Sequence, residues 1–219
     1  MGKSEHGMSI FCIGPAGEHL VKLAAICGDK GHVAGHNGSG AVMGSKKLKA
    51  IAIERSRQRV AIHDRKRLLD VSQRLLENVK NDPTSDRYQY GTLNGITRRH
   101  TPAGTLPVKN YTTNIYLISP EDLAAYDGDY IRSHFEPKPN PCWACQLHHC
   151  HMMTITEGPY TGEVVEEPEY EGTAAWGPVT GHTKVASTLV LSTEVDKLGM
   201  ETNEAGWLMG MVMECYEKG

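Results

Sequence analysis

The fold of this chain is decided by one stretch, Gly35-His36-Asn37-Gly38-Ser39-Gly40-Ala41-Val42-Met43-Gly44-Ser45-Lys46-Lys47-Leu48-Lys49-Ala50-Ile51. Its first part is rich in glycine, which leaves backbone N–H groups uncovered and permits positive φ angles. Such a loop can fold closely around a large anionic group. The lysines and the apolar run 48–53 that follow predict a strand behind the loop. A glycine turn followed by solvated lysines is the alternative interpretation.

The residues before this stretch predict a small unit of strand, helix, loop and strand. Residues 8–13 form an apolar run that ends at Gly14-Pro15, which is typical of a strand and a turn. Residues 17–26 carry apolar side chains at helical spacing, so we expect a helix there. One such unit leaves strand edges and apolar faces uncovered. Residues 1–60 are therefore interpreted as the end of a larger β-rich domain.

The remainder of the chain is predicted to be mainly helical. The helical patterns cover 64–81, the segment that begins at Ser119-Pro120, 184–198, and the residues from 202 onward. Gly199 is placed as a helix C-cap. The predicted fold class is α+β, in which the end of a β-rich domain (1–60) precedes the start of a mainly α-helical domain (61–219).

The composition describes an ordinary globular protein. The 219 residues carry a net charge of -3, and 22% of them are charged. No apolar stretch is long enough to span a membrane, and the basic run 55–67 lacks interleaved aromatic residues. We therefore expect neither a membrane nor a nucleic acid as partner. The six cysteines are clustered rather than spread as a disulfide framework, so a reducing, cytoplasmic setting is expected.

The cysteine loop Pro141-Cys142-Trp143-Ala144-Cys145-Gln146-Leu147-His148-His149-Cys150-His151 is the second chemical signal. A Cys-x-x-Cys pair brings two thiolates to one metal centre, and the third cysteine can close the same loop. Zinc bound by Cys142, Cys145, His149 and Cys150, or with His148 and His151, is an alternative. A set of structural thiols and histidines without a metal is another.

The glycine-rich stretch resembles the Gly-Arg-Gly-Gly-Leu-Gly-Ala-Val-Met-Gly-Ser-Lys-x-Leu-Lys-Ala-Ile signature of the tungsten- or molybdenum-pterin aldehyde ferredoxin oxidoreductases. Further segments resemble elements of that family in the same order: 13–18, 90–92, 104–111, 168–171 and 196–201. The resemblance covers nearly the whole chain. Because members of that family are far longer, we expect this chain to be a fragment of a larger enzyme and to be inert in isolation.

The resemblance implies a tungsten or molybdenum bis-pterin cofactor, with Mg²⁺ bridging the pterin phosphates. The residues that it assigns to this cofactor are Gly35, His36, Asn37, Gly38, Gly40, Asp196, Gly199 and Glu201. Where the family commonly has Arg-Gly, this chain has His36-Asn37, so a bidentate phosphate partner is missing. Without the family, the 196–201 segment is simply a helix end with a C-cap glycine.

The resemblance also implies a [4Fe–4S] cluster on the metal ligands Cys142, Cys145 and Cys150, although the spacing to the third cysteine is one residue longer than usual. Glu169 and Glu171 are the candidate catalytic residues. A carboxylate near the metal can accept the proton released as an aldehyde hydrate becomes an acid. An acidic, solvated surface is the alternative interpretation of the same stretch.

The expected function is the oxidation of an aldehyde to a carboxylic acid, with electrons passing through the iron–sulfur cluster to ferredoxin or another electron-transfer protein. The expected substrate is a small aldehyde or acid, and a homodimer or a subunit of a complex is the expected assembly. One alternative is a related tungsten enzyme that acts on another substrate, such as an aromatic acyl compound. The other is a small zinc-binding interaction module.

Overall fold

The structure, a computed structural model, describes residues 7–28, 31–54, 60–142 and 145–219. The elements follow in the order β1 (Met8–Ile13), α1 (Pro15–Glu18), β2 (Ile26–Gly28), β3 (His32–Ala34), α2 (Ser39–Ser45), β4 (Ala50–Glu54), α3 (Arg65–Lys80), α4 (Arg87–Tyr90), a π-helical segment (Gly95–His100), α5 (Pro120–Ala124), α6 (Gly128–His134), β5 (Glu136–Pro139), β6 (His151–Thr154), a 3₁₀ turn (Gly158–Tyr160), β7 (Val164–Glu166), α7 (Tyr170–Ala174), a second π-helical segment (Ala175–Val179), α8 (Val185–Leu198) and α9 (Thr202–Lys218). Strands and helices are mixed, and this confirms the predicted α+β class.

The N-terminal residues form an antiparallel sheet in the order β3-β2-β1-β4. The two predicted strands are present as β1 and β4, and they pair with each other. The helix predicted over 17–26 is wrong, because α1 ends at Glu18 and Ile26 already belongs to β2. Tertiary contacts override the helical spacing here: the N–H of Ala25 donates to the carbonyl of Gly199, and the carbonyl of Ala24 accepts from Gly40.

The rest of the chain builds a helical layer around a second sheet of order β5-β6-β7. Its core contains the fully buried side chains Tyr126, Ile131, Phe135, Met153, Ile155 and Leu189. The predicted helix near 64–81 is confirmed as α3, and Asp64 accepts a hydrogen bond from the N–H of Arg67 as its N-cap. The predicted helices that end the chain are confirmed as α8 and α9.

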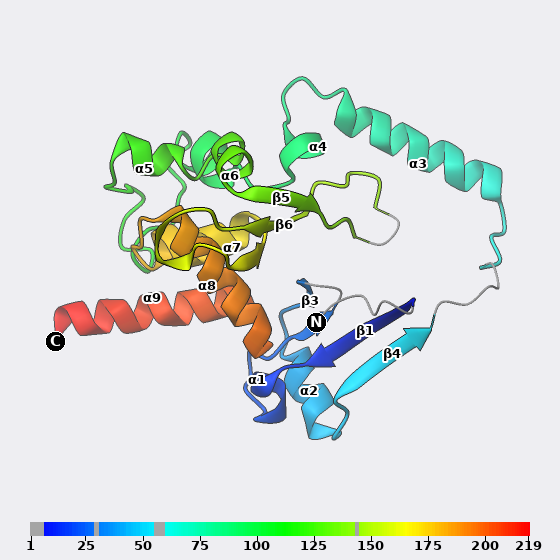
Figure 1. The fold of residues 1–219 in the computed structure, drawn as a ribbon, viewed down its shortest axis with the longest axis horizontal. Coiled ribbons are helices and arrows are strands. Elements are labelled where there is room, and N and C mark those ends of the chain that lie inside the picture. The colour runs from blue at the N-terminus through cyan, green and yellow to red at the C-terminus, as the bar shows by residue number, and fades with distance from the viewer. Residues whose placement is uncertain (1–6, 29–30, 55–59, 143–144) are drawn as a thin grey trace.

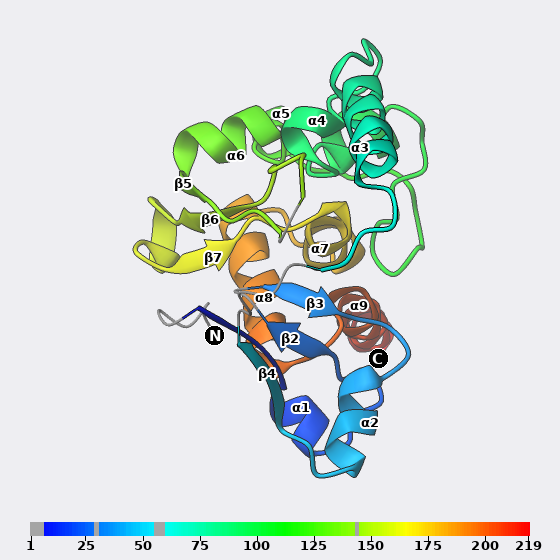
Figure 2. The same cartoon turned by 90° about the vertical axis from the view of Figure 1, so that its right-hand side faces the viewer.

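Helix α8 connects the two layers, running from the second sheet down to the N-terminal sheet in both ribbon views (Figures 1 and 2). At its end, Gly199 adopts a φ of 72° and caps the helix. A Cβ atom on Gly199 would lie 2.6 Å from the backbone nitrogen of Gly14. The helix end and the turn after β1 therefore approach each other backbone to backbone, and this contact sets the distance between the two layers.

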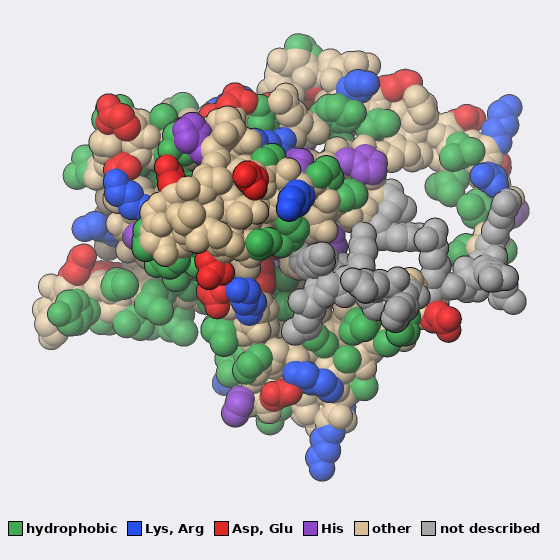
Figure 3. All heavy atoms as spheres, in the orientation of Figure 1, with side chains coloured by type: hydrophobic (Ala, Val, Ile, Leu, Met, Phe, Trp, Pro, Cys, Tyr) green, Lys and Arg blue, Asp and Glu red, His purple; other side chains and the backbone are tan. Residues whose placement is uncertain are grey.

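Apolar side chains of α9 form a row of hydrophobic spheres on the face shown in Figure 3. Leu208, Met211 and Val212 are each roughly half exposed, at 49%, 47% and 50%. Ala205, on the same helix, is buried against Ala175 and Trp176. No helix in the described part of the chain combines the length and apolarity that a membrane span needs.

Candidate active site

A cavity of about 600 Å³ lies where the two layers meet. Its walls come from Phe11 of β1, from β3 and the residues that flank it, from the cysteine loop, from the acidic stretch that leads into α7, and from α8 and the start of α9. The sequence-predicted residues that line it are Gly35, His36, Cys142, Cys150, Glu169, Glu171, Asp196 and Glu201. Residues from both layers and from widely separated parts of the sequence thus share one space.

The glycine-rich loop reaches this cavity with its first two residues. A Cβ atom on Gly35 would lie 2.9 Å from Cγ of Glu201, so only glycine fits without displacing that side chain. Nδ1 of His36 lies 3.9 Å from Oε2 of Glu201. This part of the loop therefore faces the carboxylate that begins α9.

The other glycines of the loop serve packing, and they are not among the residues that line the cavity. Gly38, with a φ of 64°, precedes α2, and its Cβ position lies 2.5 Å from the carbonyl oxygen of Lys22. The N–H of Gly40 is bonded to the carbonyl of Ala24 at 2.9 Å. Asn37 is exposed and also lies outside the lining. The buried glycines thus hold α2 against residues 22–25.

The junction of α8 and α9 supplies two carboxylates. Asp196 lies in the last turn of α8, and burial, followed by the charge of Glu201, raises the pKa of Asp196 to about 7. Glu201 is buried and accepts a hydrogen bond of 2.6 Å from the N–H of Glu204 as the N-cap of α9. Gly199 does not line the cavity, but its close contact with Gly14 brings both carboxylates to the N-terminal layer.

The cavity is strongly acidic. Besides the predicted carboxylates, Glu166 and Glu167 line it. Burial, followed by the charges of Asp196, Glu169 and Glu167, raises the pKa of Glu166 to about 9. Among the described lining residues, only His32 and His36 can carry a positive charge. Such a space favours a ligand that brings N–H donors or positive charge.

The cysteine loop contributes two of its three thiols to the cavity. Cys142 and Cys150 line it and Cys145 does not. Sγ of Cys142 lies 3.9 Å from Nδ1 of His32, and Sγ of Cys150 lies 3.4 Å from Nδ1 of His149. Burial and the adjacent Cys142 raise the pKa of the Cys150 thiol. A bound metal would reverse this direction, because it stabilises thiolates.

Two groups of three potential ligands lie within the reach of one small ion in the described residues: His149 with Cys150 and Glu169, and His36 with Glu201 and Glu204. Neither is the predicted zinc set of Cys142, Cys145, His149 and Cys150. Nδ1 of His151 is bound to Glu167 at 2.5 Å, so that nitrogen is already engaged. Trp143 and Ala144 of the loop lie outside the described residues.

Glu169 and Glu171 occupy different surroundings within the cavity. One oxygen of Glu169 accepts hydrogen bonds from the hydroxyl and the N–H of Thr92. The other lies 3.7 Å from Nε2 of His149. Glu171 is exposed in the first turn of α7. Sequence reasoning assigned no role to Thr92 or to His149 at this carboxylate, although Thr92 belongs to a segment that resembles the family.

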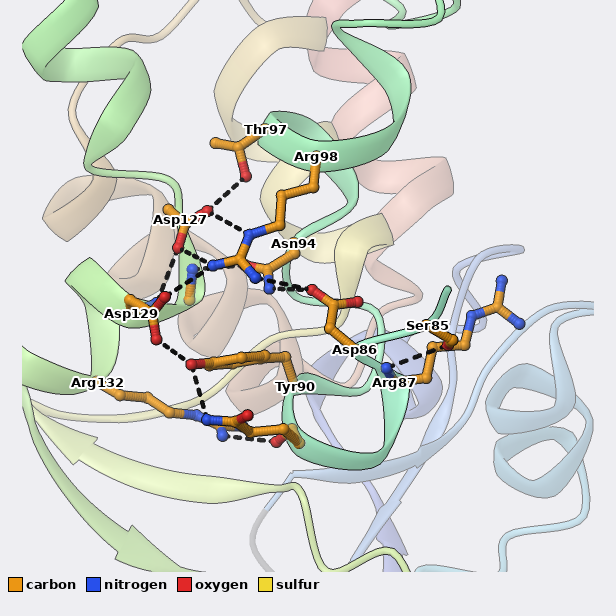
Figure 4. Close-up of polar contacts among 12 residues, drawn as sticks. Ser85, Asp86, Arg87, Tyr90, Asn94, Thr97, Arg98, Asp127, Asp129 and Arg132 are labelled. Atoms are coloured by element: carbon orange, nitrogen blue, oxygen red, sulfur yellow. Dashed lines mark hydrogen bonds and ion pairs between the residues drawn. The ribbon is translucent and has the colours of Figure 1, made fainter. Parts of the chain in front are cut away.

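Arg132 pairs with one carboxylate of the acidic wall, and a second ion-pair cluster, around Arg98, lies beside the same Tyr90 ring. Arg132 binds the buried Glu167 with Nε at 2.8 Å and donates to the carbonyl of His149, also at 2.8 Å. Figure 4 shows Arg132 beside the Tyr90 ring, and Arg98 among three aspartates. The guanidinium of Arg98 lies within 3.2 Å of Asp86, Asp127 and Asp129. Sequence reasoning missed both arginines, because ion pairs between distant segments leave no local pattern.

The sequence matches two family descriptions in succession. They are "Aldehyde ferredoxin oxidoreductase, N-terminal domain" over residues 1–55 and "Aldehyde ferredoxin oxidoreductase, domains 2 & 3" over residues 70–219. The chain is 36% identical to the tungsten-containing aldehyde ferredoxin oxidoreductases of Pyrococcus furiosus and Thermococcus kodakarensis, each over 216 residues. These alignments cover 97% of this chain and 34% of each relative, so the chain spans about a third of their length.

More distant similarity extends to other redox proteins. The WOR-like subunit of the aliphatic sulfonate oxidoreductase of Pyrococcus furiosus is 26% identical over 96% of this chain and 33% of its own. A solved structure of the active-site complex BamBC of benzoyl coenzyme A reductase with 1,5-dienoyl-CoA superposes with a TM-score of 0.72. It shares 17% identity and covers 97% of this chain and 32% of that chain, which shows a common fold.

Proposed function

Because the chain belongs to the aldehyde ferredoxin oxidoreductase family, we propose that it is part of an enzyme that oxidises an aldehyde to a carboxylic acid. Two electrons and two protons leave as the aldehyde takes up water, and the electrons pass through an iron–sulfur cluster to ferredoxin or a similar carrier. The observation that carries this proposal is the single cavity that gathers Asp196, Glu201, Gly35, Cys142 and Glu169 from both layers.

The acidic side chains of the cavity fit the N–H-bearing edges of the pterins in a tungsten or molybdenum bis-pterin. Asp196 and Glu201 would hold such a group by accepting hydrogen bonds from the N–H groups of a pterin edge, and these bonds would stabilise the ionised carboxylate that burial disfavours. Gly35 and His36 would lie beside the same group, while Asn37, Gly38, Gly40 and Gly199 shape the loop and the helix end, with Mg²⁺ at the pterin phosphates. When bound, the metal–pterin group supplies the two-electron redox chemistry.

We assign a [4Fe–4S] cluster to Cys142, Cys145 and Cys150. Two of these thiols face the same cavity, so electrons would travel a short distance between the two redox groups. The thiols need not lie as close together as the ligands of one ion, because each binds a different iron. A reducing cytoplasm would preserve such a cluster, and we place the protein there, as a homodimer or as a subunit of a redox complex.

Glu169 and Glu171 are proposed to accept the proton released from the substrate. Both line the cavity, so a substrate there could reach either carboxylate. Glu169 is the stronger candidate, because hydrogen bonds from Thr92 orient its carboxylate.

Metal and pterin contents of the full-length enzyme, expressed anaerobically, test this proposal. We expect Asp196→Ala to lose tungsten or molybdenum and pterin while retaining iron, and Cys142→Ala to lose iron. Glu194→Gln is the matched control, because Glu194 lies on the same helix, is exposed, and pairs with the exposed Lys197. If Asp196→Ala retains pterin, this cavity is not the pterin site.

Activity is measured as viologen reduction with aldehydes, and with an aromatic acyl thioester and a sulfonate for comparison. Turnover of an aldehyde supports the proposed reaction. If the enzyme turns over only the acyl thioester or only the sulfonate, that compound class replaces the aldehyde as the proposed substrate, and the family assignment is unchanged. Zinc without tungsten, molybdenum or iron would instead support an interaction module.

A further inference from the structure

We propose that the turn Tyr90-Gly91-Thr92 is a positioning device for Glu169, in which Thr92 binds one carboxylate oxygen by hydrogen bonds and His149 packs beside the other. This inference rests on the proposed proton-accepting role of Glu169. Thr92 and His149 are positioning residues in this account, since they act through the carboxylate rather than on the substrate.

A short chain of hydrogen bonds sets the direction of the Thr92 hydroxyl. The N–H of Tyr170 donates to Oγ1 of Thr92 at 2.9 Å, so the lone pairs of that oxygen are partly engaged. The hydroxyl proton is then directed to Oε2 of Glu169, which also accepts the N–H of Thr92 at 3.3 Å. Both donors come from one residue of a rigid turn.

Glu169 needs this restraint because its side chain is 47% exposed in an open cavity. A free glutamate side chain has many rotamers, and fixing it costs conformational entropy. Contacts to both oxygens select the rotamer in which the carboxylate faces the cavity. Misplacement of a reacting group by about 1 Å can cost ~100-fold in rate.

Gly91 allows His149 to take its place on the other side. Its φ is +59°, and a Cβ atom there would lie 2.6 Å from Nδ1 of His149. The imidazole therefore packs directly on the backbone of the turn, with Nε2 directed to Glu169 at 3.7 Å.

Tyr90, the first residue of the turn, packs against Arg132. The guanidinium of Arg132 lies 4.8 Å from the centroid of the Tyr90 ring and donates to the carbonyl of His149. Figure 4 shows Arg132 beside this ring. Thr92 thus binds the carboxylate itself and Gly91 packs against His149, while Tyr90 acts one step further away, through Arg132.

The test uses the full-length, cofactor-loaded enzyme and compares Thr92→Val with Thr92→Ser, alone and together with Glu169→Gln. Valine keeps the shape of threonine and removes the hydroxyl, whereas serine keeps the hydroxyl. We expect Thr92→Val to lower kcat by ~10- to 100-fold with KM changed less than about 2-fold. Thr92→Ser should retain activity within about 3-fold. In the Glu169→Gln background, Thr92→Val should have no further effect.

Metal and pterin contents and the EPR signal of the reduced cluster are measured for each variant and should stay unchanged. If Thr92→Val loses tungsten, molybdenum or iron, the residue has a structural role and the positioning proposal fails. It also fails if Thr92→Val is fully active, or if its effect persists in the Glu169→Gln background. In these cases the proposed reaction still stands, as long as Glu169→Gln has a lower kcat than the wild-type enzyme. Full activity of Glu169→Gln would overturn the role of the carboxylate itself, and the positioning device with it.

Gly91→Ala tests the His149 side of the same device. The added methyl group would displace the imidazole, and we expect kcat to fall with little change in KM. Gly104→Ala is the control, because Gly104 has a similar φ of +64° but its Cβ position has ordinary van der Waals contact with Asn114, at 3.7 Å, as its nearest neighbour among the described residues. Equal losses of kcat in the two variants would contradict a specific role for Gly91.

Discussion

Asp196 is a residue whose burial in the cavity makes its ionisation cost stability. Its folded-state pKa, about 7, lies above its ordinary value of 3.8, chiefly because of burial. The folded protein therefore holds this proton more tightly than the unfolded chain. As pH rises from about 4 to 7, ionisation of Asp196 lowers the free energy of unfolding. A ligand with N–H donors would offset that loss.

Asp196→Asn is expected to remove this pH dependence in the cofactor-free protein. The variant should gain about 2–4 kcal/mol relative to wild type between pH 4 and pH 8, since each pKa unit corresponds to about 1.4 kcal/mol. Urea unfolding at both pH values measures it. Glu194→Gln on the exposed side of α8 should follow the wild-type curve. Parallel curves for Asp196→Asn and wild type would contradict the burial of this carboxylate.

At the scale of elements, α6 ties the cysteine loop to the second sheet through one side chain. Arg132 binds Glu167 next to β7, and its other donors reach the carbonyls of Gln89 and His149. Only 3% of the Glu167 side chain is exposed. A buried carboxylate of this kind is stable only while its partners remain.

Removal of Arg132 is therefore expected to destabilise the fold strongly. Arg132→Met should lower the free energy of unfolding by about 3–5 kcal/mol, because it leaves Glu167 with His151 as its remaining partner. The double variant Arg132→Met/Glu167→Gln should recover part of this loss, since the buried charge is then gone. Chemical denaturation provides the values, and a double variant as unstable as the single one would refute the pairing argument.

At the scale of the whole molecule, the cavity exists because two layers meet at a glycine contact. Gly14 and Gly199 touch through their backbones, and the N–H of Glu201 donates to the carbonyl of Leu23 at 2.9 Å beside them. Side chains from the first layer then stand opposite Asp196 and Glu201. The site is thus a property of the junction and belongs to neither layer alone.

Gly199→Ala should disturb the fold and the site together. Its φ of 72° disfavours alanine, and the methyl group would meet Gly14. We expect a loss of about 2–4 kcal/mol in unfolding free energy and a lower tungsten or molybdenum content in the full-length enzyme. Gly162 has a comparable positive φ of +94°, but no atom of the described residues lies within 4 Å of its Cβ position, so Gly162→Ala reports the backbone strain alone. If the two variants contain equal amounts of metal, the contact between Gly14 and Gly199 is not the cause of a lower metal content.

Patterns of neighbouring residues allowed much of the fold to be predicted. Asp64 and Gly199 mark the ends of α3 and α8 as expected, because capping depends on contacts within a few residues. The helix expected over 17–26 failed, because the partners of Ala24 and Ala25 lie at residues 40 and 199. Among the residues that line the cavity, Asp196 and Glu169 were predicted through resemblance to a family. Thr92 and Arg132 were not, since their roles depend on contacts across 77 and 35 residues.

The sequence by itself determined the family, the mixed α and β composition, and which carboxylates and thiols are available for chemistry. These properties depend on residue type and on local spacing, which the order of amino acids contains directly. Only the tertiary structure decided that Asp196, Glu169 and Cys150 face one space, and that Asn37 and Cys145 lie outside its lining. That outcome depends on backbone contacts between distant segments, above all the approach of Gly14 to Gly199, where the absence of a side chain lets the two layers meet.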